Sequence, residues 1–195
     1  MIAAWEEYKR RTYSCRMNPV YFSAHQNYLL IAVENGGISL ENYEISTMLQ
    51  AYSIVYQLIM AIAVAECRLH FEHRDLGYEN ILITSASWND IIRCHFNGSA
   101  IDIHTYGARM CLRYILIGHR IKNFSINNIW RAFWPVTNVL WVGYIVDCIY
   151  HRLERSRISC SLARRAFLDH FQHLHGYGEN FIHFIRCKLF IWSLF

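Results

Sequence analysis

The chain has 195 residues, a length that fits one domain or two small ones. Hydrophobic residues make up 54% of it and charged residues 17%, which excludes an intrinsically disordered or highly charged polypeptide. The 9 glycines and 2 prolines are too few for a collagen-like or turn-dense all-β chain. The formal net charge of +4 is mildly basic, and no nucleic-acid-binding motif accompanies it.

Apolar stretches and cysteines indicate where such a chain resides. The longest unbroken apolar stretch, Leu58 to Ala65, is far shorter than the about 20 residues of a bilayer span, so we expect no membrane partner. From the charged segment 6–11 we expect no N-terminal signal peptide. The 7 cysteines are scattered and include no C-x-x-C pair, which predicts reduced, buried thiols in an intracellular protein.

The first predicted elements are a short helix and a buried strand. Residues 2–11 have a helical pattern. Tyr28–Val33 is a continuous apolar run with polar residues before it and the Glu-Asn-Gly-Gly turn 34–37 after it. We therefore expect a strand that ends in a tight turn.

The next predicted element is a long central helix. Thr47 and Gln50 have the spacing of a capping box, in which Gln50 reaches back to the N-cap. Apolar residues at helical spacing continue to about Arg68, so we expect a long helix that is almost wholly buried. The polar loop 73–80 follows it.

A small β element and more helices complete the pattern. Residues 81–84 are predicted to form a short strand, and Asn97-Gly98 is a two-residue turn signal between strands 91–96 and 99–103. Beyond residue 108 the pattern is helical, with candidates at about 137–153, 160–174 and 179–188.

The loop 73–80 carries the most informative motif. Its sequence, His-Arg-Asp-Leu-Gly-Tyr-Glu-Asn, has the H-R-D-L-x-x-x-N spacing of the protein-kinase catalytic loop. Phosphoryl transfer needs a carboxylate beside the attacking hydroxyl and an amide oxygen on magnesium. We therefore predict that Asp75 accepts the substrate proton, that Asn80 binds Mg²⁺, and that Arg74 and His73 support the loop.

A second metal carboxylate is expected after the hairpin. Asp102, within the triplet Asp102-Ile103-His104, stands at the predicted place, although the usual D-F-G is absent. The alternative interpretation of Asp102 is a plain aspartate at the end of a strand.

Several further segments resemble one kinase family, the haspins. They are Ala4–Tyr8, Glu34–Glu41, Ala63–Leu76, Asn138–Trp141 with Tyr144 and Asp147, and Cys187–Phe190. Haspins also lack D-F-G, as this sequence does. The resemblance runs from residue 4 to 190, densest before residue 84.

The resemblance implies a fold and a domain organisation. The expected fold is mainly α with a small β element, that is, the α+β C-terminal lobe of a protein kinase with a truncated N-terminal lobe. Residues 1–195 would form a single haspin-like domain fragment, with 1–37 as a remnant next to the hinge and 38–195 as the helical lobe.

The resemblance also implies an activity. Haspins are nuclear, chromosome-associated serine/threonine kinases that phosphorylate a threonine of a histone tail in mitosis. ATP and Mg²⁺ would be the cofactors and the histone peptide a partner. The adenine would contact backbone around Glu34 and Gly36, and Ser39 replaces an aspartate expected near the ribose.

Two features of a complete kinase are missing from the sequence. There is no G-x-G-x-x-G loop, and none of the lysines lies in a strand before Tyr28. Losing one preorganised electrostatic donor costs about 2.7–4 kcal/mol of transition-state stabilisation, so losing both groups predicts little activity for this chain alone.

Three functions remain open at this stage. The first is a haspin-type protein kinase with Asp75, Asn80 and Asp102 at its site. The second is a kinase-lobe module that binds a partner without phosphorylating it. The third is a small-molecule phosphotransferase of the aminoglycoside-kinase type, which shares the D-x-x-x-x-N spacing but which Arg74 and the Phe71-Glu72 lead-in disfavour.

Overall fold

A computed structural model describes residues 2–11, 17–23, 25, 27, 34–96, 98–113 and 133–171. The chain divides into two compact units, Met1–Asn35 and Gly36–Phe195. In the first unit, helix α1 (Ile2–Arg11) confirms the predicted helix, and a 3-10 helix (Pro19–Tyr21) begins at Asn18, whose side chain accepts a hydrogen bond from Val20 N–H. The predicted strand 28–33 and helix 179–188 lie outside the described residues.

Helix α2 (Met48–Leu69) is the central element of the second unit, as predicted. Thr47 caps it by accepting a hydrogen bond from the Gln50 N–H at 3.1 Å. The Gln50 carboxamide oxygen accepts from the Ser46 N–H at 2.9 Å, so the predicted reciprocal bond closes one residue before the cap. By length and composition α2 could cross a membrane, but 67% of its most apolar stretch is buried inside the protein, as expected of a core helix.

A three-stranded antiparallel sheet lies against α2. Its order is β1 (Ile38–Ser39), β2 (Ile81–Ser85) and β5 (Ala108–Leu112). The helical pattern predicted beyond residue 108 is wrong for β5. All five residues of β5 pair with β2 in the antiparallel sheet. In addition, the side chain of Gln57 on α2 forms hydrogen bonds with the backbone of Ala108 and Met110.

Strands β3 (Ile91–Phe96) and β4 (Ser99–His104) form a separate hairpin, which confirms the predicted turn signal. The hairpin is tied to α2 by the hydroxyl of Ser53, which donates to the His104 carbonyl at 2.6 Å. Phe96 and Ile103 are its buried side chains.

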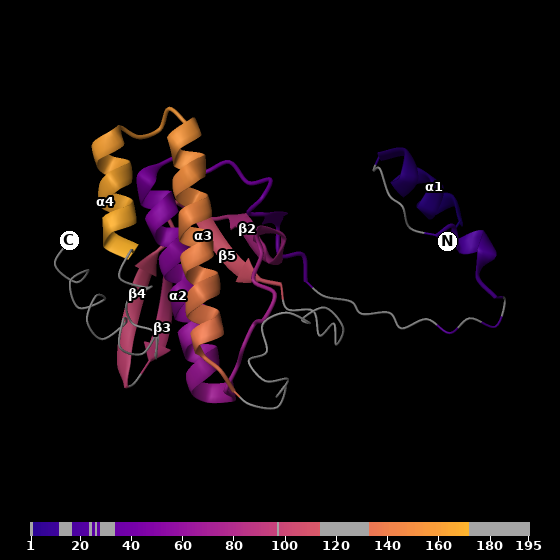
Figure 1. The fold of residues 1–195 in the computed structure, drawn as a ribbon, viewed down its shortest axis with the longest axis horizontal. Helices are drawn as coiled ribbons and strands as arrows, with labels where there is room; N and C mark the ends of the chain where they lie inside the picture. The colour runs from indigo at the N-terminus through magenta and orange to yellow at the C-terminus, as the bar shows by residue number, and fades with distance from the viewer. Residues whose placement is uncertain are drawn as a thin grey trace. The chain divides into compact units, whose positions relative to one another are not determined.

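Helices α3 (Val136–Arg155) and α4 (Ser161–Phe171) complete the unit. α2 contacts both α3 and the strands, and α4 runs beside α3 (Figure 1). The core between these layers consists of apolar side chains from the three helices and from β2 to β5, among them Tyr56, Ile59, Val142, Ile149 and Phe167. The predicted helix 137–153 is confirmed, and the predicted helix 160–174 is confirmed as far as Phe171, where the described residues end. These elements make an α+β fold.

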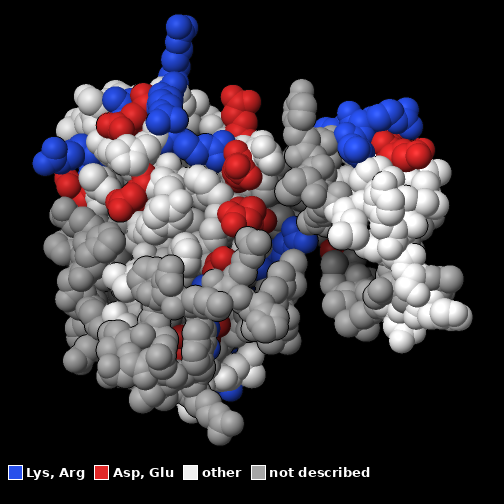
Figure 2. Space-filling view, turned by 45° about the vertical axis from the view of Figure 1, so that its right-hand side comes forward, with Lys and Arg blue, Asp and Glu red and all other residues white. Residues whose placement is uncertain are grey.

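The described cysteines differ in burial from the sequence prediction, and the charged residues of the described surface are mixed in sign. Of the described cysteines, Cys67, Cys111 and Cys160 are exposed, and the other two are half-buried, so the prediction of buried thiols is wrong for them. Cys67 lies on α2 and Cys111 on β5, while Cys160 lies just before α4, and a scattered sequence pattern does not indicate which of these positions is exposed. Basic and acidic side chains interleave on the described surface (Figure 2), as in the exposed pair Arg165–Asp169.

Two glycines with positive φ give a matched test of the fold. Gly37 (φ 98°) lies under β2, where an added Cβ would meet the Ile83 carbonyl oxygen at 2.1 Å, whereas Gly98 (φ 78°) has open space around it. We expect Gly98→Ala to lower the free energy of unfolding by about 1 kcal/mol, from backbone strain alone. Gly37→Ala should lower it by about 3 kcal/mol or more, because strain and a backbone clash add.

Urea denaturation of the two variants beside the parent chain measures this difference. Equal losses for the two variants would contradict the close approach of Gly37 to β2.

Candidate active site

The loop that carries the kinase motif begins where α2 ends. His70 terminates the helix in the left-handed conformation (φ 49°), and its N–H donates to the Glu66 carbonyl. Residues 71–77 then cross to a 3-10 helix, Tyr78–Asn80, which leads directly into β2. Leu76 is fully buried and anchors the loop in the core.

The structure brings Asp75 and Asn80 together. The Asn80 side-chain amide nitrogen donates to the Asp75 backbone carbonyl at 2.7 Å and contacts the Asp75 carboxylate at 3.3 Å. Because the amide is planar, its oxygen Oδ1 faces away from Asp75. The Asp75 carboxylate is solvent-exposed and can reach a substrate hydroxyl.

His73, the first residue of the motif, is buried, with 4% of its surface exposed. Its backbone N–H donates to Asn138 Oδ1 at 2.9 Å, and its ring meets Phe71 edge to face. Burial lowers the pKa of His73, while the Arg113 backbone and the Asp75 carboxylate act in the opposite direction. An imidazole enclosed in this way supports the loop and is not exposed to a substrate.

Arg74 adopts a left-handed backbone (φ 59°) and turns its guanidinium onto Glu72, with two bonds of 3.1 Å. The Glu72 carboxylate also accepts from the Trp134 N–H at 2.6 Å and from the Thr137 hydroxyl at 3.2 Å. Glu72 therefore joins the motif loop to the N-terminal end of α3, where a negative charge is favourable.

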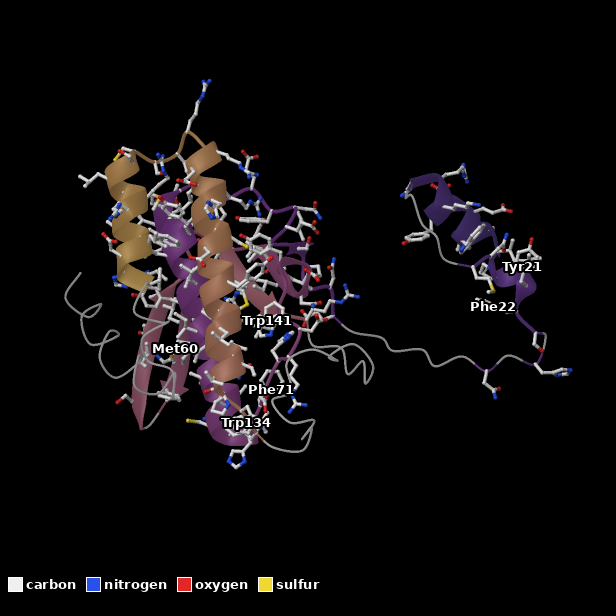
Figure 3. The ribbon with its side chains drawn as sticks, in the orientation of Figure 1. Tyr21, Phe22, Met60, Phe71, Trp134 and Trp141 are labelled. Carbon is white, nitrogen blue, oxygen red and sulfur yellow. The ribbon has the colours of Figure 1, made fainter. Side chains whose placement is uncertain are left out.

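Asn138 makes the second connection to α3. Fully buried, it accepts from the His73 N–H and donates to the Glu66 carboxylate (2.8 Å) and the Phe71 carbonyl (2.9 Å). Figure 3 shows Phe71 between Trp134 and Trp141 along α3. Sequence reasoning gave no role to Glu66 or Asn138; buried polar residues facing each other from two helices are visible only once the helices are paired.

Two of the three residues predicted to contact ATP, Gly36 and Ser39, lie at the start of the sheet. Gly36 approaches Leu82 closely, since a Cβ on Gly36 would meet Leu82 Cδ1 at 2.6 Å. Ser39 pairs with Leu82 across β1 and β2, and its hydroxyl accepts from the Asn42 amide at 3.0 Å. Glu34 is exposed and belongs to the first unit.

The structure does not place Asp102 with Asn80. Asp102 lies on β4 of the separate hairpin, where its carboxylate accepts two hydrogen bonds (2.8 and 2.7 Å) from Arg93 on β3. The bonds to Arg93 lower the pKa of Asp102. The structure thus shows Asp102 in a cross-strand ion pair, and its role as a metal ligand stays a prediction.

Arg113 occupies the position opposite Asn80. The register of β2 and β5 continues one residue beyond Ile81–Leu112, where the Arg113 N–H donates to the Asn80 carbonyl at 2.7 Å. A magnesium site of the kinase type needs an aspartate carboxylate beside the asparagine oxygen. Among the described residues, the one opposite Asn80 is an arginine, and the Asp75 carboxylate contacts the amide nitrogen of Asn80. This donor set does not fit a two-ligand magnesium site.

Asn138 provides a test of how the loop is held. We expect Asn138→Ala to lower the free energy of unfolding by about 3 kcal/mol, because three buried hydrogen bonds are lost and their partners stay buried. Asn42→Ala is the control, since Asn42 is exposed and its side chain bonds only the Ser39 hydroxyl among the bonds described. Urea denaturation measures both, and similar losses would contradict the anchoring role of Asn138.

Glu66 provides a test by pH. Burial raises the pKa of Glu66 to about 7, opposed by the bond from Asn138, and the charge of Glu72 raises it further. The folded state therefore prefers the protonated acid. The contribution of protonated Glu66 to stability is full below pH 4.5, which is the ordinary pKa of the residue. This contribution is lost as the pH rises through about 7, the pKa in the folded protein. The loss is on the order of 3 kcal/mol.

Glu66→Gln carries a permanent neutral group at the same place. The difference in unfolding free energy between the parent and this variant should change across pH 4.5–7 and level off above it. A difference that stays constant across that range, in urea denaturation at several pH values, would show that Glu66 is ionised in the folded protein.

The family model described as "Haspin like kinase domain" matches residues 1–176. The serine/threonine-protein kinases haspin of Mus musculus and Bos taurus are 27% and 28% identical over 90% and 93% of this chain. A haspin homolog of Drosophila melanogaster is 23% identical over 99% of the chain.

The chain spans only 27% of the length of the mouse and bovine relatives and 39% of the fly relative. The match nevertheless covers the motif loop, the sheet that follows it and the helix α3 that holds both. This chain belongs to the haspin-like kinase family.

Proposed function

We propose that the chain acts as a protein serine/threonine kinase of the haspin type, which transfers the γ-phosphate of ATP to a hydroxyl of a protein substrate. The observation that carries this proposal is the bonded pair Asp75–Asn80 on a loop anchored twice to α3, through Glu72 and Asn138. Names of the relatives support the class of reaction.

Asp75 has the central role in the proposed reaction. Its exposed carboxylate orients the attacking hydroxyl and accepts the proton as the oxygen bonds to phosphorus. Asn80 holds the Asp75 backbone, and His73 and Arg74 hold the loop against α3. Positioning of this kind is the main contribution that a protein makes to phosphoryl transfer.

The nucleotide would lie against the exposed side of Leu82, next to Gly36 and Ser39. Gly36 carries no Cβ, so the edge of the adenine would meet its backbone. A contact of the adenine with the backbone of Glu34, which belongs to the first unit, is proposed by resemblance to the family alone. We propose a threonine of a histone tail as the target, with action in the nucleus, on chromosomes, during mitosis, all by resemblance to the family.

A second function rests on a separate observation. Arg113 stands opposite Asn80, where a metal carboxylate would be needed, and this favours a module that binds a protein partner without phosphorylating it. The family match disfavours a small-molecule phosphotransferase.

Asp75→Asn separates the two functions. The sequence has no glycine-rich loop and no lysine in a strand before residue 28, so we expect weak transfer of radiolabelled phosphate from ATP to an N-terminal histone H3 peptide. Asp75→Asn should lower that rate by about 10²-fold or more, because the proton acceptor is lost. Asp169→Asn, an exposed carboxylate on α4, is the control and should keep the rate.

Two results would contradict the kinase proposal. One is transfer by Asp75→Asn at the parent rate. The other is the absence of transfer by a folded parent chain that binds the peptide, which would favour the binding module.

A further inference from the structure

The three-stranded sheet has two chemically different faces. Ile81, Ile83 and Ala108 face the core and are buried. The alternating residues face the other way, because successive side chains of a strand point to opposite faces. Among these, Arg109, Cys111 and Arg113 on β5 and its end are exposed, and Asn80, Leu82 and Thr84 are half-exposed.

Arg113 shares this outer face with Asn80. The two residues are directly opposite in the antiparallel register, and directly opposite side chains lie on the same face with Cβ atoms about 5 Å apart. Arg113 has no salt-bridge partner among the described carboxylates. By the alternation of the strand, its side chain leaves the backbone on the same face as that of Asn80.

The stretch of chain around and after β5 supplies no carboxylate in its place. Residues 103–146 include no Asp or Glu, so the segment that follows β5 cannot supply the metal-binding aspartate of a kinase. Asp102, the last acidic residue before that stretch, is bonded to Arg93 on the other sheet.

The acidic residues on the motif loop do not fill the role either. Asp75 faces the amide nitrogen of Asn80 rather than its oxygen. The Glu79 carboxylate lies over Gly77, and its charge adds to the bond from Cys148 that raises the pKa of Tyr144 on α3. Glu79 is therefore directed toward α3.

We propose that the outer face of this sheet binds the phosphate groups of a nucleotide directly on Arg113 and Asn80, without a divalent cation. A guanidinium offers forked N–H donors that match phosphate oxygens, and it supplies the positive charge that magnesium supplies in other kinases. Arg109, on the same face, adds to the positive field. This inference rests on the nucleotide site of the proposed function, but not on phosphate transfer.

Binding of a fluorescent ATP analogue (MANT-ATP) to the whole chain tests the proposal, measured once in excess EDTA and once in excess Mg²⁺. We expect binding in EDTA, and equal or weaker binding in Mg²⁺, because the ion competes with Arg113 for the phosphates. Inorganic tripolyphosphate should compete with the analogue and adenosine should compete poorly, which assigns the affinity to the phosphates.

Three variants sharpen the test. Arg113→Ala should weaken binding in EDTA by about tenfold or more, since charge-assisted hydrogen bonds are lost. Arg109→Ala removes the same charge from the same face but lies opposite Thr84, so its effect should stay below about fivefold. Arg113→Asp should abolish binding in EDTA and make it dependent on Mg²⁺, because it sets a carboxylate opposite Asn80. Circular dichroism checks that each variant is folded.

Three outcomes would overturn the inference: affinity that Mg²⁺ raises tenfold or more in the parent chain, unchanged affinity in Arg113→Ala, or no binding of either polyphosphate by the folded parent. The proposed kinase function is tested separately, by the transfer of phosphate. A chain that transfers phosphate only with Mg²⁺ would keep that function and lose this inference, whereas a chain that binds in EDTA and never transfers would do the reverse.

Discussion

One buried polar connection holds the candidate site in place. Asn138 on α3 bonds Glu66 near the end of α2 and the backbone of Phe71 and His73 in the motif loop. The surroundings exclude water, so each of these groups needs its partner, and the two helices and the loop are stable only in one arrangement. Asp75 and Asn80 take their positions from that arrangement.

The site so formed has two halves with different chemistry. The half that faces α3 keeps what a kinase needs to position a hydroxyl group: an exposed carboxylate at Asp75 on a rigid loop. The half at the outer side of the sheet has an arginine opposite Asn80, and the proposed binding of phosphate without a divalent cation rests on that pairing.

Much of this protein follows from local sequence. The capping residue Thr47 and the apolar spacing after it predict α2, and Asn97-Gly98 predicts the hairpin, because both signals act within a few residues. The octet 73–80 predicts a phosphoryl-transfer loop, since Asp75 and Asn80 are close enough in sequence to meet across one turn. These predictions needed no knowledge of how the elements pack.

The tertiary structure alone decided which distant residues meet. β5 is a strand because β2 and Gln57 bind its backbone, and Asp102 is half of an ion pair because the hairpin register sets it opposite Arg93. That register could not be deduced from spacing, and neither could the pairing of Asn80 with Arg113. Long-range pairing depends on which faces are buried together, a property of the whole fold, whereas turns and helix caps depend on neighbours along the chain.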